Sequence, residues 1–200
     1  DTVTYTLDGQ PVSPDDVNTM FSQNLRALFL ISDDPDNQGR AYIDGSAVRS
    51  AFATGRMVMG DENGAVDHTA GIDMLRGRGN STWVADKKPY HLKLDARTDL
   101  LDIGQPSRKW VLLADAIDAS LIRNIMTLDL ARELGIASTP HAEHVDLYYD
   151  GEYRGTYLLT EKVEVSTNRL ALNTEDGDFL CKVDLMERMD TLRNPFVTHT

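Results

Sequence analysis

Apolar and polar residues alternate with a period of two over much of this chain, a pattern typical of strands with one buried face. The alternation predicts strands over residues 26–32, 55–59, 71–76, 90–94 and 109–114. It is clearest over residues 145–159, where two alternating runs flank Asp150-Gly151. An Asp-Gly pair supplies the positive φ angles of a tight turn, so this segment predicts an antiparallel hairpin.

Residues 119–134 have helical spacing instead. Leu121, Ile125 and Leu128 form one row along the predicted helix. The row beside it consists of Ile122, Met126, Leu130 and Leu134. Together the two rows make an apolar face wide enough for burial against a sheet, so we expect Ile122, Met126 and Leu130 in the core. Gly135 and Pro140 then end the helix.

These elements predict an α+β fold, an antiparallel sheet with one long helix inserted between strands. Residues 179–183 read as a further strand, and residues 13–16 indicate the start of a short helix. The chain has no internal repeat and no linker rich in proline or serine.

Composition narrows the class of protein. The 200 residues are 41% hydrophobic and 26% charged, with one cysteine, which excludes a disordered chain and an internal disulfide. A net charge of −12 argues against a nucleic-acid binder, which needs a positive surface. No run approaches the roughly 20 apolar residues of a membrane span, so we expect none. The sequence begins at Asp1 and shows no signal peptide.

One segment is basic against this acidic background. Residues 74–94 hold five basic residues and one acid, Asp86, for a local charge of +4. The basic residues are Arg76, Arg78, Lys87, Lys88 and Lys93. Gly77 and Gly79 permit close backbone approach, and residues 80–82 add short polar side chains. This composition suits phosphate recognition, although a bent loop with solvated charges would look the same.

Five ordered blocks make the sequence resemble the spore coat protein H-like (CotH) kinase family. The first two blocks are Arg76-Gly77-Arg78-Gly79-Asn80-Ser81-Thr82-Trp83 and Lys87-Lys88-Pro89-Tyr90-His91-Leu92-Lys93-Leu94. The next are residues 109–114, the pair 120–124 with 129–135, and 151–162 with the predicted strand ending at Asp184. The resemblance covers about residues 28–184, with 1–27 as an N-terminal extension and 185–200 as the start of a further part.

The resemblance implies an atypical protein kinase that transfers the γ-phosphate of ATP, with a divalent metal such as Mg²⁺, to Ser or Thr of a protein substrate. It implies a fold like a kinase N-lobe plus the start of the C-lobe, with helix 119–134 in the place of αC. Residues 160–162 would then lie near the hinge. We find no Asp-x-Asp motif before Thr200, so the chain is expected to be an N-terminal portion of the domain, and whether it is an enzyme stays open.

The same resemblance points to candidate residues. Lys88 is expected to meet the ATP phosphates, with Lys87 and Lys93 as competitors. The other expected nucleotide-binding residues are Arg76, Arg78, Ser81, Glu161 and Arg123. Asp184 is the one late acid that we nominate as catalytic, and we assign no metal ligand.

Two other functions fit parts of the sequence, a non-catalytic surface module and a zinc site. Fungal members of this family are known as cell-surface invasins, so a non-catalytic adhesion or structural module of the same fold remains an alternative, and an extracellular or cell-surface location is expected. His141 and His144 suggest a zinc site, but they lie three residues apart next to a predicted strand, which would point them to opposite faces.

Overall fold

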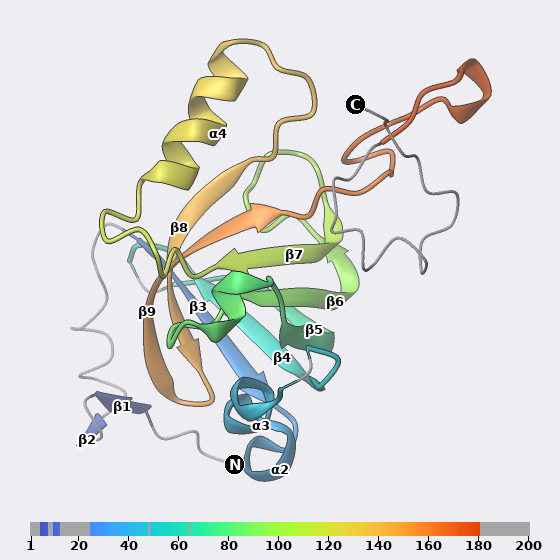
Figure 1. Cartoon of the computed structure of the whole chain (residues 1–200). Helices are drawn as coiled ribbons and strands as arrows, with labels where there is room; N and C mark the ends of the chain where they lie inside the picture. Colours follow the sequence, from blue (N-terminus) through green and yellow to red (C-terminus); the bar gives the residue numbers. More distant parts are fainter. Residues whose placement is uncertain (1–4, 8–9, 13–24, 48, 64, 181–200) are drawn as a thin grey trace.

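Most of the described chain forms a closed barrel of seven strands (Figure 1). The structure is a computed structural model that describes residues 5–7, 10–12, 25–47, 49–63 and 65–180. The barrel strands are β3 (Arg26–Ser32), β4 (Phe52–Gly60), β5 (Val66–Gly77), β6 (Tyr90–Thr98), β7 (Ser107–Leu113), β8 (Ala142–Tyr149) and β9 (Glu152–Glu161). Strands β3 to β7 form an antiparallel meander, and the β8–β9 hairpin joins its two edges.

Strands β3 and β8 form the one parallel pair in the barrel. It runs from Arg26 opposite Val145 to Leu30 opposite Tyr149. On the other side of the hairpin, β9 pairs antiparallel with β7. The two edge strands of the meander, β3 and β7, are therefore both paired with the hairpin, and the seven strands close without a free edge.

The alternation seen in the sequence fills the barrel interior. Residues of one parity point inward on each strand and are fully buried. The largest are Trp110, Tyr90, Tyr149, Tyr157, Leu28, Leu30, Met57 and Leu92. Ile43 and Trp83 join this core from outside the strands. They come from the short helices α3 (Arg40–Gly45) and η1 (Ser81–Val84).

The remaining elements lie outside the barrel. Strands β1 (Tyr5–Leu7) and β2 (Gln10–Val12) extend the sheet beyond β9, and α2 (Pro35–Gln38) precedes α3. Between β9 and residue 180, where the description ends, the chain forms an isolated bridge and η2 (Thr174–Asp176). Among the described residues, no helix combines the length and the hydropathy that a membrane crossing requires.

The strand predictions are confirmed, but the predicted fold class is wrong. All five single strands and the hairpin occur, and the turn residues Asp150 and Gly151 have φ angles of 49° and 83°. The structure is a mixed barrel and not an α+β fold like a kinase N-lobe, because the hairpin closes the sheet on itself. The predicted helix at 13–16 and most of the predicted strand at 179–183 lie outside the described residues.

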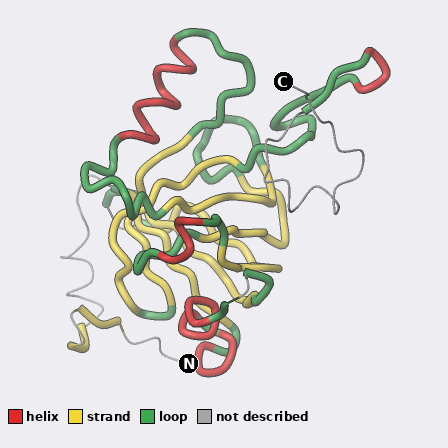
Figure 2. Tube along the Cα trace, viewed as in Figure 1, coloured by secondary structure: helices red, strands yellow, loops and turns green. Residues whose placement is uncertain are grey.

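The predicted burial of the long helix is also wrong. Helix α4 (Arg123–Glu133) is shorter than residues 119–134 and stands off the barrel (Figure 2). Ile122, Met126 and Leu130 are 47%, 60% and 57% exposed. A closed barrel fills its interior with its own side chains, so α4 contacts only the outside of the barrel. The row of Leu121, Ile125 and Leu128 is half-buried and faces the strands. The row of Ile122, Met126 and Leu130 lies in solvent.

Candidate functional site

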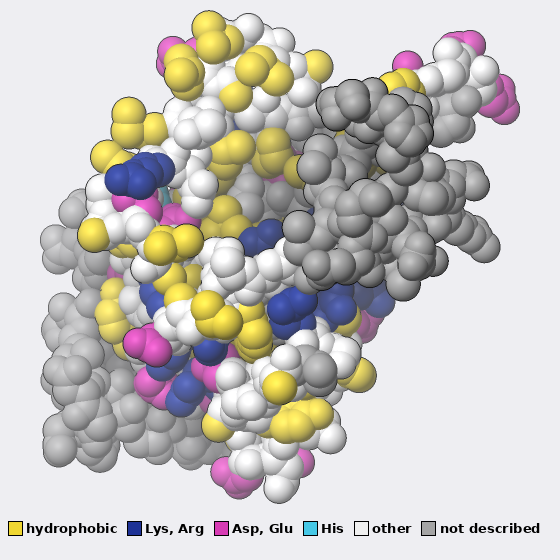
Figure 3. Space-filling view, viewed as in Figure 1, with side chains coloured by type: hydrophobic (Ala, Val, Ile, Leu, Met, Phe, Trp, Pro, Cys, Tyr) yellow, Lys and Arg dark blue, Asp and Glu magenta, His cyan; other side chains and the backbone are white. Residues whose placement is uncertain are grey.

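A groove runs between α4 and the outer surface of the barrel. Its volume is about 700 Å³, and its barrel wall consists of outward-facing residues of β6, β7 and β9. Val111 and Leu113 of β7 are apolar parts of this wall, and Leu128 of α4 faces them. We call this hollow the α4 groove. Figure 3 shows Lys and Arg side chains across the middle of the same side of the molecule, below α4.

A second hollow of about 330 Å³ adjoins the α4 groove near the start of α4. Arg78, Leu113 and Asn124 line both hollows. Arg123 lines only the second hollow, together with Thr82 from the turn after β5. The two hollows therefore meet at Arg78, which places this arginine at the centre of the combined site.

Strand register brings basic side chains together on the outside of β5, β6 and β7. Arg76 of β5 lies opposite His91 of β6, and His91 lies opposite Val111 of β7. One step along, Lys93 lies opposite Lys109. Side chains opposite each other on neighbouring strands lie about 5 Å apart at Cβ, so these cations form a cluster on the outer surface.

The cations of this cluster differ in their partners. Lys93 pairs with Asp73 at 3.2 Å, and Lys109 pairs with Glu164 at 2.6 Å. Arg76 and Arg78, by contrast, form no ion pair with any described carboxylate, and the Nε atom of Arg76 is buried without a described hydrogen-bond partner. Burial lowers the pKa of Arg78. Two arginines without an acid suit an anionic ligand that supplies the missing acceptors.

His91 lines the α4 groove beside these arginines, and the sequence analysis did not single it out. Burial, followed by the charges of Arg76, Lys162, Arg78 and Lys109, lowers the pKa of His91 to about 4. Its Nε2 atom is buried and has no described hydrogen-bond partner. Lys162, which follows β9, also lines the groove and was not predicted.

Lys88 and Lys87 lie elsewhere. The Lys88 ammonium donates to the Trp83 carbonyl at 2.7 Å and lies 5.3 Å from the centre of that indole ring. Lys87 donates to the Thr156 carbonyl and lies over Tyr157. Neither lysine lines the α4 groove or the second hollow. The structure thus places Arg78 and Glu161 in the α4 groove, with Arg76 close by. The Lys88 ammonium instead contacts Trp83, five residues earlier in the chain.

The two glycines of the basic segment have structural roles. A Cβ atom on Gly77 would lie 2.3 Å from the Trp83 ring, and Gly79 has a φ angle of +85°. Gly77 therefore lets Trp83 pack on β5, and Gly79 makes the turn that follows. Ser81 is exposed at the start of η1 and lines neither hollow, and Asp184 lies outside the described residues.

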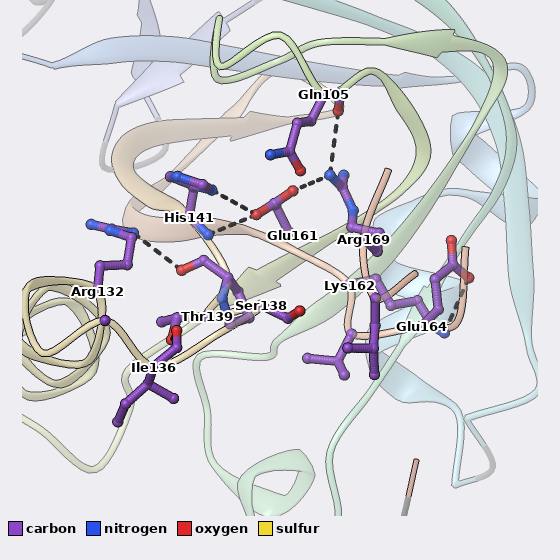
Figure 4. Close-up of a pocket in the computed structure, with 14 residues that line it drawn as sticks. Gln105, Arg132, Ile136, Ser138, Thr139, His141, Glu161, Lys162, Glu164 and Arg169 are labelled. Carbon is purple, nitrogen blue, oxygen red and sulfur yellow. Dashed lines mark hydrogen bonds and ion pairs between the residues drawn. The ribbon is translucent and has the colours of Figure 1, made fainter. Parts of the chain in front are cut away.

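Glu161 forms one edge of the α4 groove and also lines a third hollow of about 430 Å³ behind β9. Figure 4 shows its carboxylate held between His141 and Arg169. It accepts from the His141 backbone at 2.8 Å and pairs with Arg169, and both charged side chains are at least 95% buried. Arg169 also lies over the Trp110 ring at 4.7 Å. These contacts make Glu161 a structural anchor at the end of β9.

The described residues contain one cluster of potential metal ligands, Asp67, His68 and Asp102. It lies apart from the α4 groove, since none of its members lines that hollow. The guanidinium of Arg26 already pairs with both aspartates and also with Glu143. The described groove residues likewise offer no free set of carboxylates, because Glu161 is bound to Arg169 and His141. The described lining of the α4 groove therefore does not by itself fit Mg²⁺.

The α4 groove lies within a region that matches a known protein family. A family model described as CotH kinase protein matches residues 75–197, more than half of the 200 residues. The matched region contains β6, β7, α4 and β9, which enclose the α4 groove. A search of curated proteins finds no match.

Proposed function

This chain belongs to the CotH kinase protein family, and from that membership and the α4 groove we propose that it binds the polyphosphate of ATP there. The family resemblance expected from the sequence is confirmed. The proposed reaction is transfer of the γ-phosphate to Ser or Thr of a protein substrate, and an extracellular or cell-surface location belongs to the same proposal.

One observation carries the proposal: Arg76 and Arg78 lie near His91, and neither forms an ion pair with a described carboxylate. The net charge of the chain is −12, so a concentrated set of unpaired cations is unusual on its surface. A polyphosphate would supply several oxygens to such a set, and forked guanidinium groups bind phosphate oxygens in pairs.

The remaining lining suits the other parts of a nucleotide. Val111, Leu113 and Leu128 give the α4 groove an apolar wall on which a flat base can pack, and Lys162 adds a cation at the far end. Phosphoryl transfer depends mainly on positioning and on neutralising the phosphate charge, and the arginines do both. Mg²⁺, when bound to ATP, would neutralise further charge. Asp184 remains the candidate for the catalytic acid.

Binding of ATP to two matched variants tests the proposal. Arg78→Ala should weaken ATP binding at least tenfold in calorimetry, because each charge-assisted contact contributes about 1.5–3 kcal/mol. Arg97→Ala should leave binding unchanged, since Arg97 is an exposed arginine on β6 about 20 Å along the strand from His91. Absence of ATP binding by the unmodified protein, or equal binding by the two variants, would contradict the proposal.

A phosphotransfer assay distinguishes a kinase from a non-catalytic module of the same family. Labelled ATP with Mg²⁺ and a Ser/Thr-rich acceptor should yield labelled protein if the chain carries the activity. ATP binding without transfer would instead support the non-catalytic module of the same family.

A further inference from the structure

His91 occupies a position in the α4 groove that its surroundings do not explain. It lies on β6 between Arg76 of β5 and Val111 of β7, on the outward side of the barrel. Its Nε2 atom is buried and unpaired among the described residues, although a buried polar atom without a partner costs about 1–3 kcal/mol. Because the side chain lines the groove, a ligand in the groove is the natural source of that missing partner.

The charged groups around His91 come from every neighbouring strand. Arg76 and Arg78 approach from β5, Lys109 from β7 and Lys162 from the end of β9. The nearby acids have other partners. Glu161 pairs with Arg169, Glu164 with Lys109 and Lys162, and Asp73 with Lys93. Asp115 and Asp118 line the adjoining hollow with Arg78; Asp115 accepts from Asn124, and Asp118 accepts from Ser120 and Arg123. Burial, together with the positive charges of these four side chains, lowers the pKa of His91 to about 4 and keeps the imidazole neutral near pH 7.

We propose that His91 is a phosphate-binding residue of the α4 groove and takes up a proton from solvent when a polyphosphate binds. The inference rests on the proposed function and adds to it a residue and a coupled proton. A bound polyphosphate cancels much of the field from the four cations, which favours the protonated ring. No covalent bond changes: one solvent proton moves to the imidazole, which then donates to a phosphate oxygen.

The sign of the pH effect follows from linkage. Since the ligand raises the pKa of His91, binding must tighten as pH falls through the bound-state pKa, and this gain must level off below about pH 4. A terminal phosphate also titrates near pH 6, so affinity alone mixes two protonations. A measurement on the ring itself avoids this ambiguity.

Proton NMR titration of the imidazole Cε1–H signals supplies that measurement. The whole chain is titrated alone, with a saturating non-hydrolysable ATP analogue, and with saturating tripolyphosphate; His91→Gln assigns the signal. We expect both probes to raise the pKa of His91 by at least one unit. His68 lies on the same strand β5 as Arg76 but beside Asp67 and Asp102, and it does not line the α4 groove. Its Cε1–H chemical shift at a fixed pH should be the same with and without the probes, which makes it the internal control.

The outcomes separate this inference from the proposed function. If both probes bind and the titration of His91 does not move, the inference is wrong while the proposed function stands. A shift with the ATP analogue alone, when tripolyphosphate also binds, contradicts a phosphate contact. If neither probe binds, both proposals fail. Should His91→Gln not fold, through-bond assignment in the unmodified chain leaves the test intact, and His91→Asn is the second variant.

Discussion

At the scale of single residues, the predicted role of Lys88 in phosphate binding is a sharp point to test, because its side chain lines neither hollow. Its ammonium is bound to the Trp83 carbonyl and lies over the Trp83 ring. Lys88→Met removes both contacts, so we expect the free energy of unfolding to fall by about 1 kcal/mol in a urea melt. ATP affinity should be unchanged. A tenfold loss of affinity at unchanged stability would return Lys88 to the phosphate site.

Glu161 gives a second prediction at this scale. Glu161→Ala leaves the Arg169 guanidinium buried without its carboxylate, which should lower the free energy of unfolding by about 3–5 kcal/mol. Glu164→Ala is the matched control, because Glu164 pairs with the more exposed Lys109 and Lys162 and should cost less than about 1 kcal/mol. Equal losses of unfolding free energy in the two variants would show that the buried Glu161–Arg169 pair stabilises the fold no more than the exposed Glu164 pairs.

Sequence reasoning named part of the candidate site. Arg76 and Arg78 were accessible to it because the basic composition of residues 74–94 is a local feature. His91 and Lys162 were missed because each belongs to the site only through cross-strand register. His91 lies opposite Arg76 of β5, and Lys162 shares the carboxylate of Glu164 with Lys109 of β7. No local pattern specifies those contacts.

At the scale of elements, the two rows of α4 should respond differently to truncation. Ile122→Ala should change the free energy of unfolding by less than about 0.5 kcal/mol, since this side chain is 47% exposed. Ile125→Ala, on the half-buried row that faces the barrel, should cost about 1–2 kcal/mol. Urea melts of the pair measure the contrast, and a larger loss for Ile122 would reverse the orientation of the helix.

The strands were predictable and their closure was not. Alternation and the Asp150-Gly151 turn depend on neighbouring residues, so they can be read locally. Closure depends on pairing Arg26 with Val145, two residues far apart in the chain. A sequence that predicts a meander and one helix is equally consistent with an open sheet covered by the helix. The predicted fold class and the predicted burial of α4 both rested on that open sheet, so both were wrong.

At the scale of the whole molecule, the charge distribution predicts a strong effect of salt. The chain carries a net charge of −12, yet Arg78 in the α4 groove and Arg76 close by have no described ion-pair partner, so we expect ATP to be repelled at long range and attracted at short range. Raising NaCl from 0.05 to 0.5 M should weaken ATP binding about tenfold, because screening acts within a few ångströms at high salt. Titration calorimetry at several salt concentrations measures this, and an affinity independent of salt would contradict phosphate-dominated binding.

The parallel joint between β3 and β8 also has a consequence for biosynthesis. Arg26 leaves the ribosome 119 residues before its partner Val145, a delay of about 6–24 s at 5–20 residues per second. During that interval the nascent meander has two unpaired edges, β3 and β7, each able to pair with another chain. Barrel closure therefore waits for the final hairpin, and translational pauses before residue 142 should favour misassembly over folding.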